Sequence, residues 1–233
     1  MFLYFFVFLY TTLCKAEKVD WCNPSNLSME GEELKKTIDV LQSITKSKSC
    51  QQMLGRLRKS KSLDLSHRDI SDIRILIESD LEVLLLRSTF VTDISVLQHQ
   101  HKLRILDISK TKIDASQVSY IPIENIETLY LGNNNLQGLD FRTLCTAPKL
   151  TFVSLRDSHI ANVESFQRCR HLSFLSLEGN EISDISMMRG LKNIKSIDLY
   201  GNPLQDCPVK KNSTLYHRCM EAKEQQWEKP LEK

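Results

Sequence analysis

The sequence predicts an α/β solenoid: a curved, horseshoe-shaped stack of coils with a parallel β-sheet on its concave face and a helical N-terminal cap. Two observations support this fold class. An apolar pattern of about 22 residues recurs through the middle of the chain, and an amphipathic segment precedes its first copy. Because a solenoid must cover the exposed ends of its core, a cap beside the first coil is expected.

Each copy of the pattern has an anchor, an aliphatic residue that is followed by a second aliphatic residue two positions later. Successive anchors lie 21, 22, 23, 24, 22 and 22 residues apart. A further aliphatic residue stands seven positions after each anchor. The anchors are Leu63, Leu84, Leu106, Leu129, Val153, Leu175 and Ile197. Seven copies in phase over residues 60–205 form the leucine-rich-repeat pattern, LxxLxLxxNxI.

The pattern has a direct physical interpretation. Side chains alternate between the two faces of a strand, so the anchor and the residue two later point into the coil. A single coil cannot bury that face alone, and neighbouring coils stack to share one core. Five positions after the anchor, small polar residues are expected to satisfy loop backbone groups in a ladder. They are Thr89, Thr111, Asn134, Ser158, Asn180 and Asn202, with Arg68 as the exception in the first copy.

The segments that follow the strands carry a family resemblance. ISDI (70–73), VTDISVL (91–97) and ISDISMM (182–188) resemble the I-x-D-I-x-x-L convex segment of the internalins. The resemblance covers the repeat region and implies a protein that binds a host-cell surface protein on its concave face. The longer copies around Leu129 and Val153 depart from the period, which predicts a less regular solenoid there.

The segment before the repeats, within 17–59, is predicted to be a helical cap. Residues 28–44 place Leu34, Ile38, Leu41 and Ile44 on one stripe. A shorter amphipathic stretch over 50–60 turns three apolar residues inward: Met53, Leu54 and Leu57. A lid over the first repeat is favoured over a membrane-binding or partner-binding helix.

The segment after the repeats, 206–233, is predicted to be a C-terminal cap with a polar tail. Residues 201–220 are expected to be rich in loops. The tail that follows is polar apart from Trp227 and Leu231, so a short frayed helix or disorder is expected.

The N-terminus has an apolar run over residues 2–13, which is shorter than the ~20 apolar residues of a transmembrane helix. A signal peptide over 1–16, cleaved after Ala16, is therefore predicted, and the protein is expected to be secreted, periplasmic or on the cell surface. No basic residue precedes the run, so an uncleaved anchor or an intracellular protein is the alternative. A lipidated Cys14 is disfavoured because Leu13 precedes it. Asn26 and Asn212 lie in glycosylation sequons.

Apart from Cys14, the cysteines number six, which suits disulfides in an exported protein. Cys22 and Cys50 flank the N-terminal cap, and Cys207 and Cys219 flank the segment after the last repeat. Cys145 and Cys169 occupy the same position in adjacent coils, about 4.8 Å apart, within reach of a bridge. Two buried free thiols are the alternative for that pair. No CxxC or HxxxH spacing supports a metal site.

Nothing in the sequence indicates catalysis or a cofactor. The net charge of +2 gives no drive toward nucleic acid or an acidic membrane. The motifs of hydrolases, nucleotide-binding proteins and zinc proteases are absent from the sequence. His99 and His101 are interpreted as solvated turn residues. Aspartates recur one position after the anchor but in separated repeats, too far apart for a carboxylate pair; they are Asp64, Asp107 and Asp198.

The predicted concave face carries the candidate site. Residues one before, one after and three after each anchor should point to that side. The candidate partner-binding residues are Phe152, Phe174, Tyr130, Arg156, Arg87 and Tyr200. Aromatic and arginine side chains with polar residues around them are typical of binding hot spots. The alternative is that neighbouring side chains half-cover these rings and that no partner exists.

Three aliphatic residues of the same face, Val83, Leu85 and Ile105, are better explained as strand formers. The sequence thus predicts a non-enzymatic protein that binds another protein on its concave face. A structural scaffold of an envelope or matrix is the first alternative. A subunit that recruits a catalytic partner, or an intracellular regulatory scaffold if the N-terminus is retained, is the second. A membrane association is expected only if the N-terminal segment is retained or lipidated.

Overall fold

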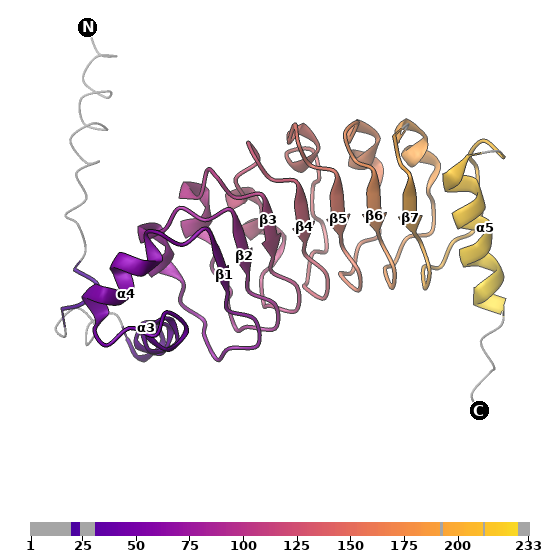
Figure 1. The fold of residues 1–233 in the computed structure, drawn as a ribbon. Helices are drawn as coiled ribbons and strands as arrows, with labels where there is room; N and C mark the ends of the chain where they lie inside the picture. The colour runs from indigo at the N-terminus through magenta and orange to yellow at the C-terminus, as the bar shows by residue number, and fades with distance from the viewer. Residues whose placement is uncertain (1–19, 24–30, 192, 212, 228–233) are drawn as a thin grey trace, which may run out of the picture.

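The computed structural model describes residues 20–23, 31–191, 193–211 and 213–227. Figure 1 shows an elongated row of coils with helices at both ends. The predicted signal peptide and both sequon asparagines, Asn26 and Asn212, lie outside the described residues. Within the described ranges, no helix combines the length and apolar character that a membrane span requires.

The strands form one parallel sheet in chain order, as predicted. Anchor pairs with anchor in every register, beginning with Leu63 opposite Leu84 and ending with Leu175 opposite Ile197. This register places equivalent positions of successive repeats side by side. The strands are β1 (Ser62–Asp64), β2 (Val83–Leu85), β3 (Ile105–Asp107), β4 (Thr128–Tyr130), β5 (Phe152–Ser154), β6 (Phe174–Ser176) and β7 (Ser196–Asp198).

The opposite side of the row is built from short 3₁₀ helices. They are η1 (Arg74–Glu78), η2 (Ser95–His99), η3 (Ala115–Tyr120), η4 (Leu144–Thr146), η5 (Glu164–Arg168) and η6 (Ser186–Gly190). Before each of these helices, a side-chain oxygen of Asp or Asn accepts the backbone N–H two residues later, as Asp93 does from Ser95 at 2.8 Å. The equivalent acceptors are Asp72, Asp114, Asp140, Asn162 and Asp184. The aspartate of the ISDI-type segments is therefore a turn-forming residue.

The turn after each strand uses a left-handed residue four positions after the anchor. The φ angles there lie between 50° and 72°, a conformation that favours glycine. Only two of the seven are glycine; the residues are His67, Ser88, Lys110, Asn133, Asp157, Gly179 and Gly201. At Gly179 a Cβ atom would collide with the Asp157 carboxylate, so a larger residue there requires the Asp157 side chain to move.

The predicted polar ladder runs through the interior. Asn180 is 4% exposed; its Nδ2 donates to the carbonyls of Leu155 and Leu177, and its Oδ1 accepts the N–H groups of Ser158 and Ile160. The other five ladder residues are also buried. Arg68 is exposed, as expected for the repeat next to the cap.

The N-terminal cap consists of α3 (Glu32–Ile44) and α4 (Cys50–Leu57). The predicted apolar faces are buried in both helices, except that Ile44 is half-buried. Thr37 Oγ1 donates to the carbonyl of Asp72 at 2.6 Å, which attaches α3 to the first coil. The Cys22–Cys50 disulfide, with a Cα–Cα distance of 5.6 Å, ties the chain before α3 to the start of α4.

The C-terminal cap differs from the expected loop-rich segment. A helix, α5 (Thr214–Trp227), begins inside it and packs against β7. Its buried face is Leu215, Cys219 and Ala222, and the Cys207–Cys219 disulfide fixes it to the chain before it. Alanine and cysteine give a weak apolar signal, so the i, i+4, i+7 stripe is hidden in the sequence.

In the longer repeats the structure joins Cys145 to Cys169 across adjacent coils. Beside this disulfide the buried rings of Phe141 and Phe166 stack with centroids 4.2 Å apart. The 3₁₀ helix of the first of these two coils, η4, has only three residues.

Candidate binding surface

Three aromatic side chains from adjacent strands lie side by side on the strand face; Tyr130, Phe152 and Phe174 are called the aromatic row below. The ring centroids of Tyr130 and Phe152 are 5.0 Å apart, and those of Phe152 and Phe174 are 6.4 Å apart. Phe174 is 41% exposed, and the other two are half-buried. The β4–β5–β6 register produces this arrangement, because it sets Phe152 opposite Phe174.

Arg156 extends the aromatic row on its polar side. Its guanidinium contacts Glu178 Oε2 at 2.8 Å and Asp157 Oδ2 at 3.0 Å. Burial raises the pKa of the Glu178 carboxyl; Arg156 opposes this by favouring the charged form, whereas Asp198 and Asp157 raise it further. Glu178 and Asp198 are not among the predicted binding residues, although both occupy positions of the repeat that face this surface.

The remaining predicted binding residues lie apart from the aromatic row. Arg87 follows β2, two strands away from Tyr130, and donates to Ser109 Oγ at 3.3 Å. The register therefore places Arg87 two strands along the row from Tyr130. Tyr200 is 40% exposed in the last coil, beyond Phe174. Val83, Leu85 and Ile105 are half-buried in the sheet.

A cleft of about 290 Å³ lies between β7 and α5, at the end of the strand face. Asp198 and Tyr200 contribute from the sheet side. Arg218, Glu221 and Gln225 line it from the helix. Asp198 thus contributes a carboxylate to the cleft itself.

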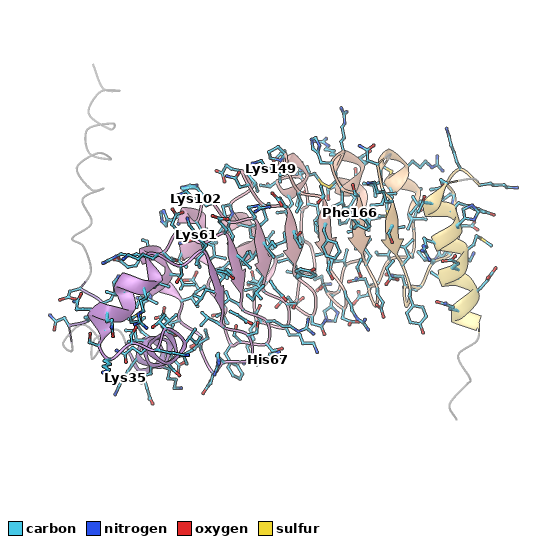
Figure 2. The ribbon with its side chains drawn as sticks, in the orientation of Figure 1. Lys35, Lys61, His67, Lys102, Lys149 and Phe166 are labelled. Atoms are coloured by element: carbon cyan, nitrogen blue, oxygen red, sulfur yellow. A yellow bond between two sulfur atoms is a disulfide. The ribbon has the colours of Figure 1, made fainter. Side chains whose placement is uncertain are left out.

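Charges along the edge where the strands begin are mostly paired with one another. Lys102 forms an ion pair with Asp80. Arg104 donates two hydrogen bonds to Glu127, one to each carboxylate oxygen. Figure 2 shows Lys61, Lys102 and Lys149 along this edge and His67 on the opposite edge. These ion pairs link neighbouring coils, so the edge is a less suitable binding surface than the strand face.

The aspartates that recur one position after the anchor have a structural role. Asp64, Asp107 and Asp198 each accept the backbone N–H two residues later, at 2.9, 2.9 and 3.0 Å. Among the described residues, no group of three or more His, Cys, Asp or Glu side chains is placed to hold a metal ion.

Comparisons with known proteins agree with this geometry. The Leucine Rich Repeat family profile matches residues 125–147. An internalin from Listeria monocytogenes shares 22% identity and a TM-score of 0.57, with 73% of this chain and 57% of that chain covered. Internalin C2 of the same bacterium shares 17% identity and a TM-score of 0.55, with 76% and 88% covered. No curated protein sequence matches the chain significantly.

A plant structure has the same fold. It is the ectodomain of a membrane receptor kinase from Arabidopsis thaliana in complex with CASPARIAN STRIP INTEGRITY FACTOR 2. The identity is 20% and the TM-score 0.52, with 65% of this chain and 19% of that chain covered. The chain thus spans a little over half of the first internalin and about a fifth of the plant ectodomain.

Proposed function

Because the chain is a leucine-rich-repeat protein with a fold similar to that of the internalins, we propose that it acts by binding a protein partner on its strand face. Proteins with this fold generally mediate protein–protein binding and are typically not enzymes. The partner-binding residues in this proposal are Tyr130, Phe152, Phe174, Arg156 and Tyr200. Arg87 belongs to a separate, N-terminal part of the same face.

The observation that carries the proposal is the exposure of the aromatic row. Phe174 and Tyr200 keep about two-fifths of their surface exposed, although the chain has an extensive core in which to bury rings. An exposed ring, Phe174, next to the half-buried rings of Tyr130 and Phe152 and beside Arg156 matches the composition of binding hot spots. Phe90, another exposed aromatic residue among those that the structure describes, is 49% exposed, and the Lys112 ammonium group lies 4.9 Å from the centre of its ring.

We also propose that the protein is exported, with residues 1–16 as a signal peptide, 17–59 and 206–233 as caps, and 60–205 as the repeats. Three disulfides support an oxidising compartment, because cytosolic proteins rarely keep such bridges. Intact mass of the natively purified protein tests export. Loss of residues 1–16 with six blocked cysteines is expected, and a full-length chain with free thiols would contradict it.

The binding proposal is tested with the double variant Phe152→Ala, Phe174→Ala. Wild type and variant are immobilised and exposed to surface and extracellular proteins of the native source. A protein that binds the wild type and not the double variant is expected. Phe90→Ala is the matched control, because it removes an equally exposed ring outside the strand face. Equal loss of binding by Phe90→Ala, or no effect of the double variant, would contradict the proposal.

A further inference from the structure

The charge of the strand face is uneven near its C-terminal end. Three carboxylates, Asp157, Glu178 and Asp198, gather around one guanidinium, that of Arg156. The Arg156 guanidinium forms ion pairs with both Asp157 and Glu178, so one positive charge faces two carboxylates. The negative charge of Asp198 acts on Glu178 and raises the pKa of its carboxyl, so Asp198 lies close to this group as well. This end of the surface therefore has an excess of negative charge beside an apolar ring, Phe174.

The cleft between β7 and α5 continues this negative surface. Asp198 lines it, and Tyr200 places an exposed ring beside it, a favourable neighbour for a cation. The one basic residue that lines it among the described residues, Arg218, contacts Glu221 at 2.7 Å on its own helix. Arg218 is thus already paired and does not neutralise Asp198.

The cleft also contains a residue with a free backbone donor. In each of the first six coils, the N–H two positions after the anchor donates to a carbonyl of the next coil, as Leu177 does to Asp198 at 2.8 Å. In the last coil this residue is Leu199, which lines the cleft, and its N–H has no acceptor among the residues that the structure describes. A partner that brings a carbonyl oxygen would satisfy this donor.

We propose that the partner segment on the strand face carries a basic side chain that enters the cleft between β7 and α5. This rests on the proposed function and specifies the partner's chemistry. An arginine or lysine there contacts Asp198 and Glu178 beside the Tyr200 ring, and a backbone carbonyl accepts the Leu199 N–H. Apolar side chains of the same segment cover Phe152 and Phe174.

The dimensions suit a single extended segment. Strands β5 and β7 are two spacings apart, about 10 Å at ~4.8 Å per strand. About three extended residues, at ~3.3 Å each, span that distance. A short peptide is therefore long enough to reach from Phe152 to the cleft, and charge complementarity orients it with its basic residue toward α5.

Selection from a library of random displayed peptides tests the proposal. The full disulfide-bonded chain is the target, and the Phe152→Ala, Phe174→Ala variant removes peptides that do not use the aromatic row. The remaining peptides are expected to be enriched in Arg or Lys next to apolar residues. A synthetic peptide of that kind should bind the Glu178→Gln, Asp198→Asn variant roughly ten- to a hundredfold more weakly.

The controls separate this inference from the proposed function. Asp198→Asn keeps an oxygen that can accept the Tyr200 N–H. Glu164→Gln makes the same charge change as Glu178→Gln alone, on the opposite side of the row. Peptides that need the aromatic row but lack basic residues, or that bind the charge variant undiminished, would overturn the inference and leave the proposed function standing. If no selected peptide depends on the aromatic row, both are overturned.

Discussion

Arg156 Nη1 lies 2.8 Å from Glu178 Oε2, and this ion pair joins the fifth and sixth coils beside the exposed ring of Phe174. The pair does not fully offset the combined effect of burial and of the neighbouring Asp198 and Asp157 carboxylates, because the pKa of the Glu178 carboxyl remains above its ordinary value. A charge held at some cost to stability beside exposed aromatic rings is consistent with a binding role for this end of the strand face.

Replacing Glu178 should stabilise the fold at neutral pH. The pKa of the Glu178 carboxyl is higher in the folded protein than in the unfolded chain. Between the two pKa values the folded protein binds more protons, so the free energy of unfolding falls as pH rises through that range. Glu178→Gln is therefore expected to raise the Tm at pH 7, with the gain fading below about pH 4. Thermal unfolding across pH measures this.

The matched control is Glu181→Gln, which alters an exposed carboxylate in the same coil. A lower Tm for Glu178→Gln at pH 7 would show that the Arg156 contact outweighs the burial of the carboxyl.

Removing the rings of the aromatic row should leave the fold intact. Phe174 is substantially exposed and Phe152 half-buried, so Phe152→Ala with Phe174→Ala is expected to lower the unfolding free energy by about 1–2 kcal/mol and no more. Denaturant unfolding with circular dichroism provides the measurement. Loss of cooperative unfolding would show that these rings belong to the core, and the candidate site would be wrong.

Asn180 should be far more sensitive than its size suggests. Its side chain accepts two backbone N–H groups and donates to buried carbonyls. Asn180→Ala leaves several of these groups unsatisfied, each at about 1–3 kcal/mol, and is expected to lower the unfolding free energy by roughly 3 kcal/mol or more. Asn193→Ala, which removes one hydrogen bond to the Arg170 carbonyl at an exposed site, should have a small effect. Equal effects would contradict the ladder.

Asp184 should make stability sensitive to acid. Hydrogen bonds from Ser186 Oγ and the Ser186 N–H lower the pKa of its carboxyl. The stability that this provides is present above the ordinary Asp pKa of 3.8 and is lost as pH falls through the lowered value. Asp184→Asn keeps an acceptor oxygen, as Asn162 does one coil earlier. The wild-type Tm is expected to fall more than the variant Tm below pH 3.8; parallel curves would refute this.

The N-terminal cap should depend on its disulfide. Cys22 and Cys50 close a loop with a sequence separation of 28 and hold the chain before α3 against α4. Replacing both with Ser is expected to reduce the unfolding free energy by about 2–4 kcal/mol, measured by denaturant unfolding. Under reducing conditions the wild type should lose at least as much, and an unchanged midpoint after reduction would be evidence against the bridge.

The repeat register can be predicted from the sequence because the anchors recur in phase, and that phase is sufficient to place Phe152 beside Phe174. The left-handed turn residues cannot be predicted in this way, since His67 and Asp157 give no glycine signal where the backbone requires one. Helix α5 is hidden because Cys219 and Ala222 form much of its buried face. The ion pair of Glu178 with Arg156 depends on side-chain conformations, which a repeat pattern does not encode.

The most direct test of partner binding on the strand face is site-specific photocrosslinking. A photoreactive residue replaces Ser154, next to Phe152 in β5, or Ser119 on the opposite, 3₁₀-helix side of the row. Binding through the aromatic row predicts a discrete crosslinked partner from position 154, lost in the Phe152→Ala, Phe174→Ala background, and none from position 119. The same partner from both positions, or only from 119, would contradict binding through the aromatic row.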